Sequence, residues 1–294
     1  MRARRGWLGA GLVLGVGSVW VALGSQSDLV AAAPAAGQAL APPPQTYTPP
    51  RTPDGQPDMQ GHWSAVPGGS YSVEDTGIQA LGGGVLTPEL AERIRTGKRS
   101  SRIVDPPDGR IPYQPWAAAR AKFLFDQHLN PRPESVDAQA RCMPGGIPRE
   151  MYHLPYQILQ APGNVIILFE FAHAYHVIPL NAAAAPLREN INLYMGDSRG
   201  RWEGNTLIVE STNFNDKNWF DIVGSFHSDA LRVLERFTII DADTINYEAT
   251  IEDPKVLTRS WTMAFPMRRI KEPGYELMEH ACHEGERDLR HSVR

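Results

Sequence analysis

From residue 155 onward, apolar and polar positions alternate with a period of two, which is typical of strands that bury one face. Short turn-forming loops join the runs in pairs, so neighbouring strands should pair antiparallel. No helix long enough for a parallel crossover lies between them. The pattern predicts a mostly-β fold, an antiparallel meander that closes into a barrel or folds as a sandwich. The strands that we expect span residues 165–171, 175–179, 199–203, 206–211, 231–239, 244–252 and 257–265.

Two short helices are predicted ahead of these strands. Residues 86–97 (LTPELAERIRTG) start at a capping threonine, Thr87, and end at a glycine. Residues 114–131 (QPWAAARAKFLFDQHLNP) carry several aromatic residues on one side and end at a proline. We therefore expect a helical embellishment over residues 86–131 that covers one end of the β domain.

The chain opens with the features of a secretory signal peptide. Three arginines among the first five residues precede an apolar run, and the small residues AAAPAAGQA follow it. An uncleaved membrane anchor is the alternative, because the run is about as long as a short spanning helix. We predict a signal peptide over 1–36, a disordered Pro-rich tether over 37–58 and a single domain over 59–294.

Charge and cysteine usage narrow the partners and the compartment. The formal net charge is −4, and it becomes −6 when the three arginines and one aspartate of residues 1–36 are removed. Since no run of Lys or Arg follows, neither nucleic acid nor a membrane surface is an expected partner. The two cysteines, Cys142 and Cys282, are predicted to form a disulfide in a periplasmic or secreted protein. Two unrelated buried thiols are the alternative.

Residues 196–200 (GDSRG) match the G-x-S-x-G pattern of serine hydrolases. In those enzymes a strand precedes the serine and a helix follows it. Here the chain leads directly into Gly204-Asn205, which is a two-residue hairpin signal. We therefore expect Ser198 to lie at the start of a β-hairpin, and a serine hydrolase is only the third hypothesis for function.

The hairpin around Gly204-Asn205 has one apolar and one charged face, because side chains alternate along a strand. The charged face carries Arg199, Arg201, Glu203 and Glu210. If it points outward, it forms exposed salt bridges of little energetic weight. If it lines a cavity, the two arginines are fork-shaped donors for a carboxylate or phenolate, with Glu203 beside them.

The motif GDSRGRWEGNTLIVEST, followed by LRVLERFTIIDADTINYEATIEDP and HACHEG, resembles an uncharacterised exported bacterial family. That family carries the hairpin motif GDSxGxWEGDTLVV and a C-terminal ACHEG, and the stretches at 51–63 and 142–149 also fit it. The resemblance implies a calycin-like or lipocalin-like barrel, and Gly61-His62-Trp63 is similar to the G-x-W of lipocalin first strands. The chain departs from the family at FAHAYHVIPLNAAAAP, where the family has arginines and a D-G-R turn.

This departing hairpin carries most of the candidate chemistry. Counted outward from His173, Glu170 should face His176 across two strands in an apolar setting. A carboxylate beside an imidazole in such a setting can act as a general base, and a buried structural ion pair is the alternative. Tyr175 and His173 lie beside this pair as candidate substrate contacts, with His173 at the turn and exposed unless a lid covers it.

Other ionisable residues complete the candidate set. Glu235 stands in an apolar row, where a carboxylate is either functional or paired with an arginine such as Arg199. His227 is a candidate base at the barrel mouth or a solvated loop residue, and His153 is a candidate substrate contact. Residues 279–284 are rich in His and Glu but contain neither C-x-x-C nor H-E-x-x-H, so we predict no metal and no organic cofactor.

Two functions follow from this reading. The first is a cofactor-independent enzyme that performs acid–base chemistry, as an isomerase, lyase, cyclase or hydrolase, on a small apolar or aromatic molecule inside the barrel. The second is a non-catalytic periplasmic carrier of a lipophilic small molecule. In the enzyme, the catalytic residues would be Glu170, His176, His227 and Glu235. The substrate would contact Arg199, Arg201, Glu203, His153, His173 and Tyr175.

Overall fold

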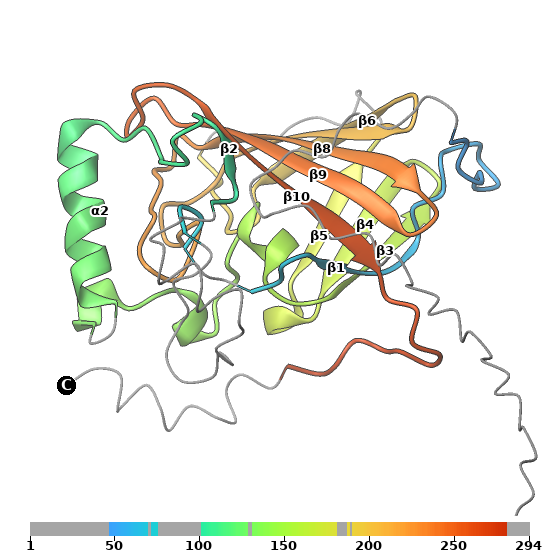
Figure 1. Ribbon diagram of the computed structural model, residues 1–294, viewed down its shortest axis with the longest axis horizontal. Helices are drawn as coiled ribbons and strands as arrows, with labels where there is room; N and C mark the ends of the chain where they lie inside the picture. The colour runs from blue at the N-terminus through green and yellow to red at the C-terminus, as the bar shows by residue number, and fades with distance from the viewer. Residues whose placement is uncertain are drawn as a thin grey trace, which may run out of the picture. The chain divides into compact units, whose positions relative to one another are not determined.

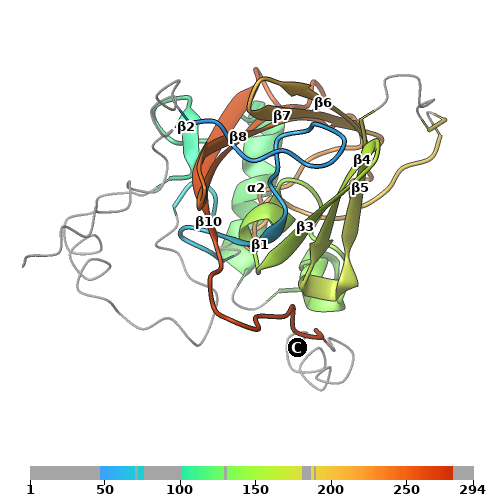
Figure 2. The ribbon, with the colours of Figure 1, turned by 90° about the vertical axis from the view of Figure 1, so that its right-hand side faces the viewer.

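Antiparallel strands form most of the described structure, a computed structural model that covers residues 47–69, 72–75, 101–128, 131–180, 187–188 and 190–280. The strands are β1 (Gly61–Ala65), β2 (Ile103–Asp105), β3 (Tyr156–Ala161), β4 (Asn164–Phe169), β5 (Tyr175–Pro179), β6 (Asp197–Glu203), β7 (Thr206–Thr212), β8 (Arg232–Asp241), β9 (Thr244–Glu252) and β10 (Trp261–Arg269). They belong to one sheet with the order β5-β4-β3-β1-β10-β9-β8-β7-β6, and β2 pairs with β10. The first and last strands of this path, β5 and β6, lie side by side, so the path forms a nearly closed barrel (Figure 2).

The predicted meander is confirmed in its main hairpins and forms a nearly closed barrel. The hairpin β6–β7 has the register that follows from a Gly204-Asn205 turn, and the predicted strands at 231–239 and 244–252 pair antiparallel as β8 and β9. The final strand begins at residue 261, four residues later than predicted, because backbone bonds from Val256 and Leu257 to Asp253 form a turn there. Residues 156–161, which are not among the predicted strands, form β3 and pair with both β1 and β4.

Only one helix of seven or more residues occurs in the described part of the chain. It is α2 (Pro115–Gln127), which matches the predicted helix at 114–131 and lies at one end of the barrel (Figures 1 and 2). The other predicted helix, at 86–97, lies outside the described residues. Four short 3-10 turns also occur: η1 (Pro133–Ser135), η2 (Gln139–Arg141), η3 (Arg149–Tyr152) and η4 (Phe171–His173).

Buried aromatic side chains fill the barrel interior. Phe237, Tyr247 and Phe265 come from three adjacent strands and are fully buried. The ring of Tyr247 lies 5.0 Å from that of Phe237 and 4.8 Å from that of Phe265, measured between centroids. Trp63 and Tyr156 extend the same packing on β1 and β3. These side chains occupy space in which we expected a ligand, as is usual for small barrels with a packed core.

Several predictions concern residues beyond the described ranges. The predicted signal peptide at 1–36 and Cys282 both lie there, so the signal peptide and the Cys142–Cys282 disulfide remain predictions. The described part of the chain contains no free cysteine. Its single longer helix is too short and too polar to cross a membrane.

Candidate functional site

The β4–β5 hairpin has a different register from the predicted one. His176 pairs with Ile167, not with Glu170. The chain makes a wider turn than expected, because Ala172 and His173 adopt the left-handed conformation with φ of 52° and 50°. The register is shifted by three residues, and an odd shift moves side chains to the opposite face of a sheet. The predicted Glu170–His176 pair is therefore wrong.

Glu170 holds the C-terminal segment instead. Its side chain is buried, and Oε2 accepts hydrogen bonds from the hydroxyl of Tyr275 at 3.4 Å and from the backbone N–H of Met278 at 3.3 Å. Burial and the neighbouring carboxylate both raise the pKa of Tyr275, so its hydroxyl keeps the proton that it donates. These contacts give Glu170 a structural role, in which it fixes residues 275–278 against the hairpin.

His176 meets another residue considered from the sequence, Ser198, across the boundary between β5 and β6. Nε2 of His176 lies 2.5 Å from Oγ of Ser198, and Oγ of Ser211 lies 2.7 Å from the same oxygen. All three side chains are buried. No strand ladder joins β5 to β6 among the described residues, so this chain of side-chain contacts, hereafter the seam contact, links the two ends of the sheet.

The seam contact meets one requirement for serine catalysis and lacks others. A base next to the hydroxyl is needed, and burial lowers the pKa of His176 to about 4, so the ring is neutral at pH 7. However, Nδ1 of His176 has no hydrogen-bond partner in the described structure, so no carboxylate orients the ring. Ser198 is only 2% exposed, and β6 continues into a hairpin as predicted, not into a helix. A substrate would reach Ser198 only if the boundary opened.

The charged face of the β6–β7 hairpin points outward. Arg201 is half-exposed and forms ion pairs with Glu203 and Glu210 at 3.1 and 2.7 Å. Arg199 pairs with Asp197 at 2.7 Å. The outward alternative is therefore the observed one. Arg199, Arg201 and Glu203 do not reach the barrel interior and cannot hold a ligand there.

Glu235 lies inside the barrel, as its alternating pattern predicted, but its partner is not an arginine. The hydroxyl of Tyr247 donates to Oε1 at 2.9 Å, and Oε2 has no partner in the described structure. The carboxyl is fully buried. Burial raises its pKa to about 8 in spite of the hydrogen bond, so Glu235 is protonated at neutral pH.

The remaining candidates are separate from one another. His227 is buried, with Nε2 located 2.8 Å from Oδ1 of Asn218, and is not solvated at a barrel mouth. His173 and Tyr175 are exposed on the outer side, Tyr175 by 65%. Of the predicted catalytic and substrate-binding residues that the structure describes, Arg201 and Glu203 are in contact, but they form an exposed ion pair on the outer face and do not line a cavity with the other candidates.

A buried polar cluster near η3 was only partly anticipated by the sequence. Arg149 forms a fork with the carboxylate of Asp137, at 2.8 and 2.6 Å. Gln139 links Glu150 to Nδ1 of His153, which explains why this histidine is held in place. Burial raises the pKa of Glu150 to about 7 and lowers that of His153 to about 3. The adjacent Arg-Glu pair inside a Gly- and Pro-rich stretch was the available signal.

A cleft of about 480 Å³ lies between α2 and the nearby end of the barrel. Its apolar lining includes Ile111, Tyr113, Phe125 and Val223. Its charged groups are Asp75 and two ion pairs, Arg110 with Glu74 at 3.3 Å and Lys122 with Asp126 at 2.6 Å. We call this cavity the α2 cleft.

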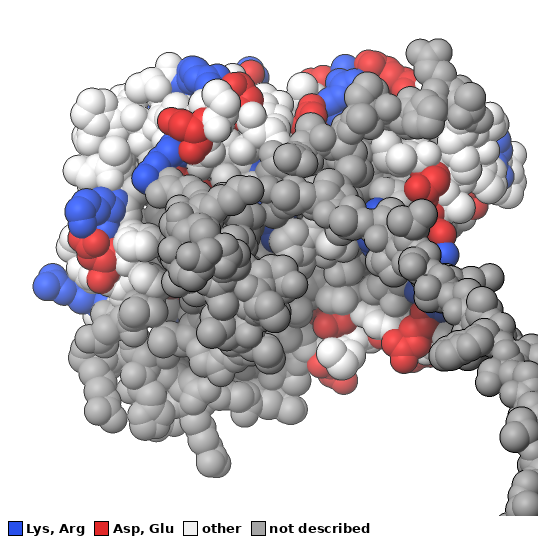
Figure 3. All heavy atoms as spheres, viewed as in Figure 1, with Lys and Arg blue, Asp and Glu red and all other residues white. Residues whose placement is uncertain are grey.

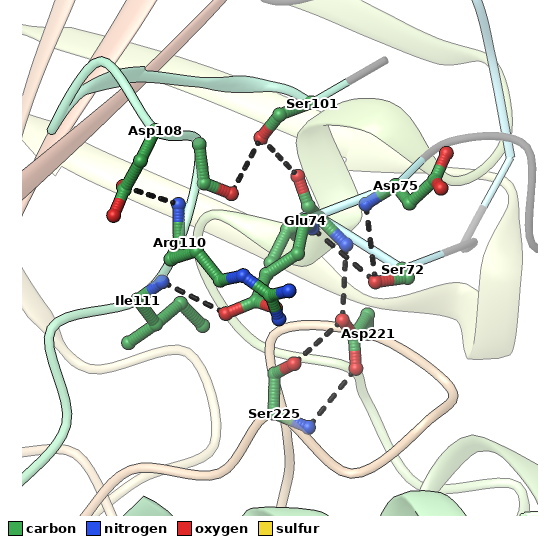
Figure 4. A network of polar contacts seen from close by, with 11 residues as sticks. Ser72, Glu74, Asp75, Ser101, Asp108, Arg110, Ile111, Asp221 and Ser225 are labelled. Carbon is green, nitrogen blue, oxygen red and sulfur yellow. Dashed lines mark hydrogen bonds and ion pairs between the residues drawn. The ribbon is translucent and has the colours of Figure 1, made fainter. Parts of the chain in front are cut away.

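A hydrogen-bond network holds the walls of the α2 cleft together (Figure 4). The buried carboxylate of Asp221 accepts from the backbone N–H groups of Val73, Val223 and Ser225 and from the Ser225 hydroxyl. Glu74 accepts from the N–H of Ile111 at 2.8 Å. Three segments distant in sequence are thus fixed around one cavity, which therefore exists without a ligand.

The predicted helix at 114–131 contains the sequence signal for one wall of the α2 cleft. The helix contributes Ala118, Ala121, Lys122 and Phe125, which follow the i, i+3, i+4, i+7 spacing of one helical face. The aromatic residues of this helix predict a covering helix, but they do not by themselves indicate a cleft. The opposite wall comes from loops around residues 72–75, 110–113 and 223–225, which have no periodic pattern.

The described residues contain no group of three or more His, Cys, Asp or Glu side chains placed to bind a metal ion. On the face seen in Figure 3, basic and acidic side chains are interspersed, without a broad patch of one sign among the coloured residues. Comparison of the chain with protein-family models and with curated proteins finds no match.

Proposed function

We propose that the protein binds a small amphipathic molecule in the α2 cleft and acts as a carrier or binding protein. The observation that supports this proposal is a preformed cleft of about 480 Å³ with an apolar lining and two ion pairs. Ligand sites for small molecules are usually concave, mostly apolar and of this size. The packed aromatic residues of the barrel interior make the cleft a better site than the lumen that we first expected.

The lining favours a ligand with an apolar or aromatic body and a neutral or zwitterionic polar end. Each basic side chain of the cleft already has an acidic neighbour, so an excess charge on the ligand gains little. A carrier is favoured over an acid–base enzyme because Glu150 and Glu235, whose pKa values are raised to about 7 and 8, are buried elsewhere. Burial also raises the pKa of Asp221, but this carboxyl group is buried in the cleft wall and already accepts hydrogen bonds from Val73, Val223 and Ser225. We also propose, from the signal-like N-terminus and the motif resemblance, that the protein is exported and related to calycin-like barrels.

The test uses the fluorescence of N-phenyl-1-naphthylamine, a neutral aromatic probe, titrated with the purified protein. Ala118→Trp places an indole in the cleft, whereas Ala119→Trp places it on the neighbouring exposed position that does not line the cleft. We expect Ala118→Trp to weaken probe binding by about tenfold or more, and Ala119→Trp to leave it unchanged. Equal affinity of both variants, with both folds intact by circular dichroism, would refute the proposal.

A serine-dependent hydrolase is the second candidate, and the seam contact is the observation that favours it. Treatment with a fluorophosphonate followed by mass spectrometry shows whether Ser198 reacts. Labelling of Ser198 that disappears in His176→Ala, while the fold persists, would support a hydrolase. Absence of labelling under conditions that label a known serine hydrolase would exclude it.

A further inference from the structure

A second cavity lies beside α2 and differs from the α2 cleft in size and charge. It has a volume of about 200 Å³ and is lined by Arg120, Val136, Arg141, Tyr194, Asp216, Lys217 and Trp219. Ala117 and Leu124 mark the buried edge of α2. Since a helix turns by about 100° per residue, Arg120 lies on one side of this edge and the residues of the α2 cleft lie on the other. We call this second cavity the basic pocket.

Three basic side chains converge on the basic pocket from three parts of the chain. Arg120 comes from α2, Arg141 from the end of η2 and Lys217 from the loop after β7. Within the described structure none of the three side chains forms a hydrogen bond or an ion pair. Cζ of Arg120 lies 5.8 Å from the ring centroid of Phe226, which is a cation–π contact. Asp216 is the one acidic side chain in the lining, so the pocket carries an excess of positive charge.

This arrangement contrasts with the basic residues elsewhere around α2. Arg110 and Lys122 both have acidic partners in the α2 cleft, and the chain as a whole has a net charge of −4. The three basic residues are exposed. Their charges around one cavity attract anions, and an arginine pair offers fork-shaped donors for a carboxylate or phosphate. The charge therefore points to an anionic ligand.

The other lining residues indicate what accompanies the negative charge. Tyr194 and Trp219 are half-buried and Val136 is buried, so the cavity has aromatic and apolar walls beside its basic groups. A cavity of about 200 Å³ is smaller than the usual site for a drug-sized molecule. We propose that the basic pocket binds a small aromatic carboxylate of about the size of benzoate, at a site separate from the α2 cleft.

Isothermal titration calorimetry with benzoate, benzyl alcohol and inorganic phosphate tests this proposal on the purified protein. We expect benzoate to bind, benzyl alcohol to bind at least tenfold more weakly, and added salt to weaken benzoate binding. Arg141→Gln should reduce benzoate affinity by about tenfold, whereas Arg232→Gln, an exposed residue of β8 outside the pocket, should not. Phosphate that binds as tightly as benzoate would show a general anion site and overturn the aromatic assignment.

The two sites are distinguished by testing the variant of each site with the ligand of the other site. Ala118→Trp should leave benzoate binding intact, and Arg141→Gln should leave the binding of N-phenyl-1-naphthylamine intact. Benzoate binding that is unaffected by Arg141→Gln, or that is lost in Ala118→Trp, would overturn the basic pocket as a separate site. Neither result depends on whether the α2 cleft binds its own probe.

Discussion

Substitution of Glu235 by glutamine should change how the stability of the protein depends on pH. The carboxyl is fully buried, and its pKa is raised from 4.5 to about 8 by burial. Between these two values the folded state holds a proton that the unfolded state has released, so the wild-type protein loses stability as pH rises. At about 1.4 kcal/mol per pH unit, the loss between pH 5 and pH 8 amounts to about 4 kcal/mol.

Glutamine has no proton to lose in this range, so Glu235→Gln removes this particular loss. Its amide oxygen can still accept the hydrogen bond from Tyr247, which reaches Oε1 in the wild type. An amide group buried without a full set of partners costs about 1 to 3 kcal/mol, but this cost is the same at each pH. The informative quantity is therefore the slope of the stability difference with pH, not its absolute value.

Urea unfolding, followed by tryptophan fluorescence at pH 5, 6, 7 and 8, measures this slope. We expect the free energy of unfolding of the variant, relative to that of the wild type, to increase by about 4 kcal/mol from pH 5 to pH 8. Glu252→Gln, at an exposed position on the neighbouring strand β9, is the control and should give parallel curves. Parallel curves for Glu235→Gln as well would refute a buried, protonated carboxyl at this position.

Two further predictions concern the ends of the sheet and the contact with α2. Burial lowers the pKa of His176 to about 4, so as pH falls the imidazole is protonated in the unfolded state before it is protonated in the folded state. The free energy of unfolding should therefore fall by about 3 kcal/mol between pH 6.5 and pH 4. Thermal melts of His176→Ala over this range should show a smaller fall, and an unchanged fall would contradict a buried neutral ring. A Cβ at Gly224 would lie 2.3 Å from Cβ of Leu124, at a φ of +94°, so Gly224→Ala should cost about 2 to 4 kcal/mol and weaken probe binding in the α2 cleft. Gly163→Ala, which has positive φ but open space, should cost only about 1 kcal/mol in the same urea titration.

The sequence predicted those hairpins whose turns have a simple local signal. Gly204-Asn205 defines a two-residue loop, and the pairs of β6 and β7 follow from it by counting. The predicted register of the β4–β5 hairpin is wrong because nothing in its sequence indicates that Ala172 and His173 adopt positive φ. The register of a hairpin decides which residues face each other and which face of the sheet each side chain occupies. An error in one turn therefore gives His176 a different partner and removes the predicted general base.

The candidate site was harder to predict than the fold, because its parts come from loops. Strand periodicity identified Glu235 as an inward residue, but the distance to Tyr247 depends on how β8 and β9 are staggered. The walls of the α2 cleft depend on Asp221, a loop residue without periodic neighbours that accepts hydrogen bonds from Ser225 of its own loop and from the distant Val73. Such long-range pairings carry no signature in a single sequence.

The packing of α2 explains why both proposed sites lie beside this helix. Only Ala117 and Leu124 are buried, while Trp116, Phe123 and Phe125 remain 39–52% exposed. Full burial of one leucine is worth about 2 kcal/mol, so the helix is held to the barrel by a small apolar contact. A helix with a narrow buried edge leaves space on both of its sides. The α2 cleft lies on one side of this edge, and the basic pocket lies on the other. The packed barrel thus serves as a rigid support, and ligand binding is expected where α2 meets it.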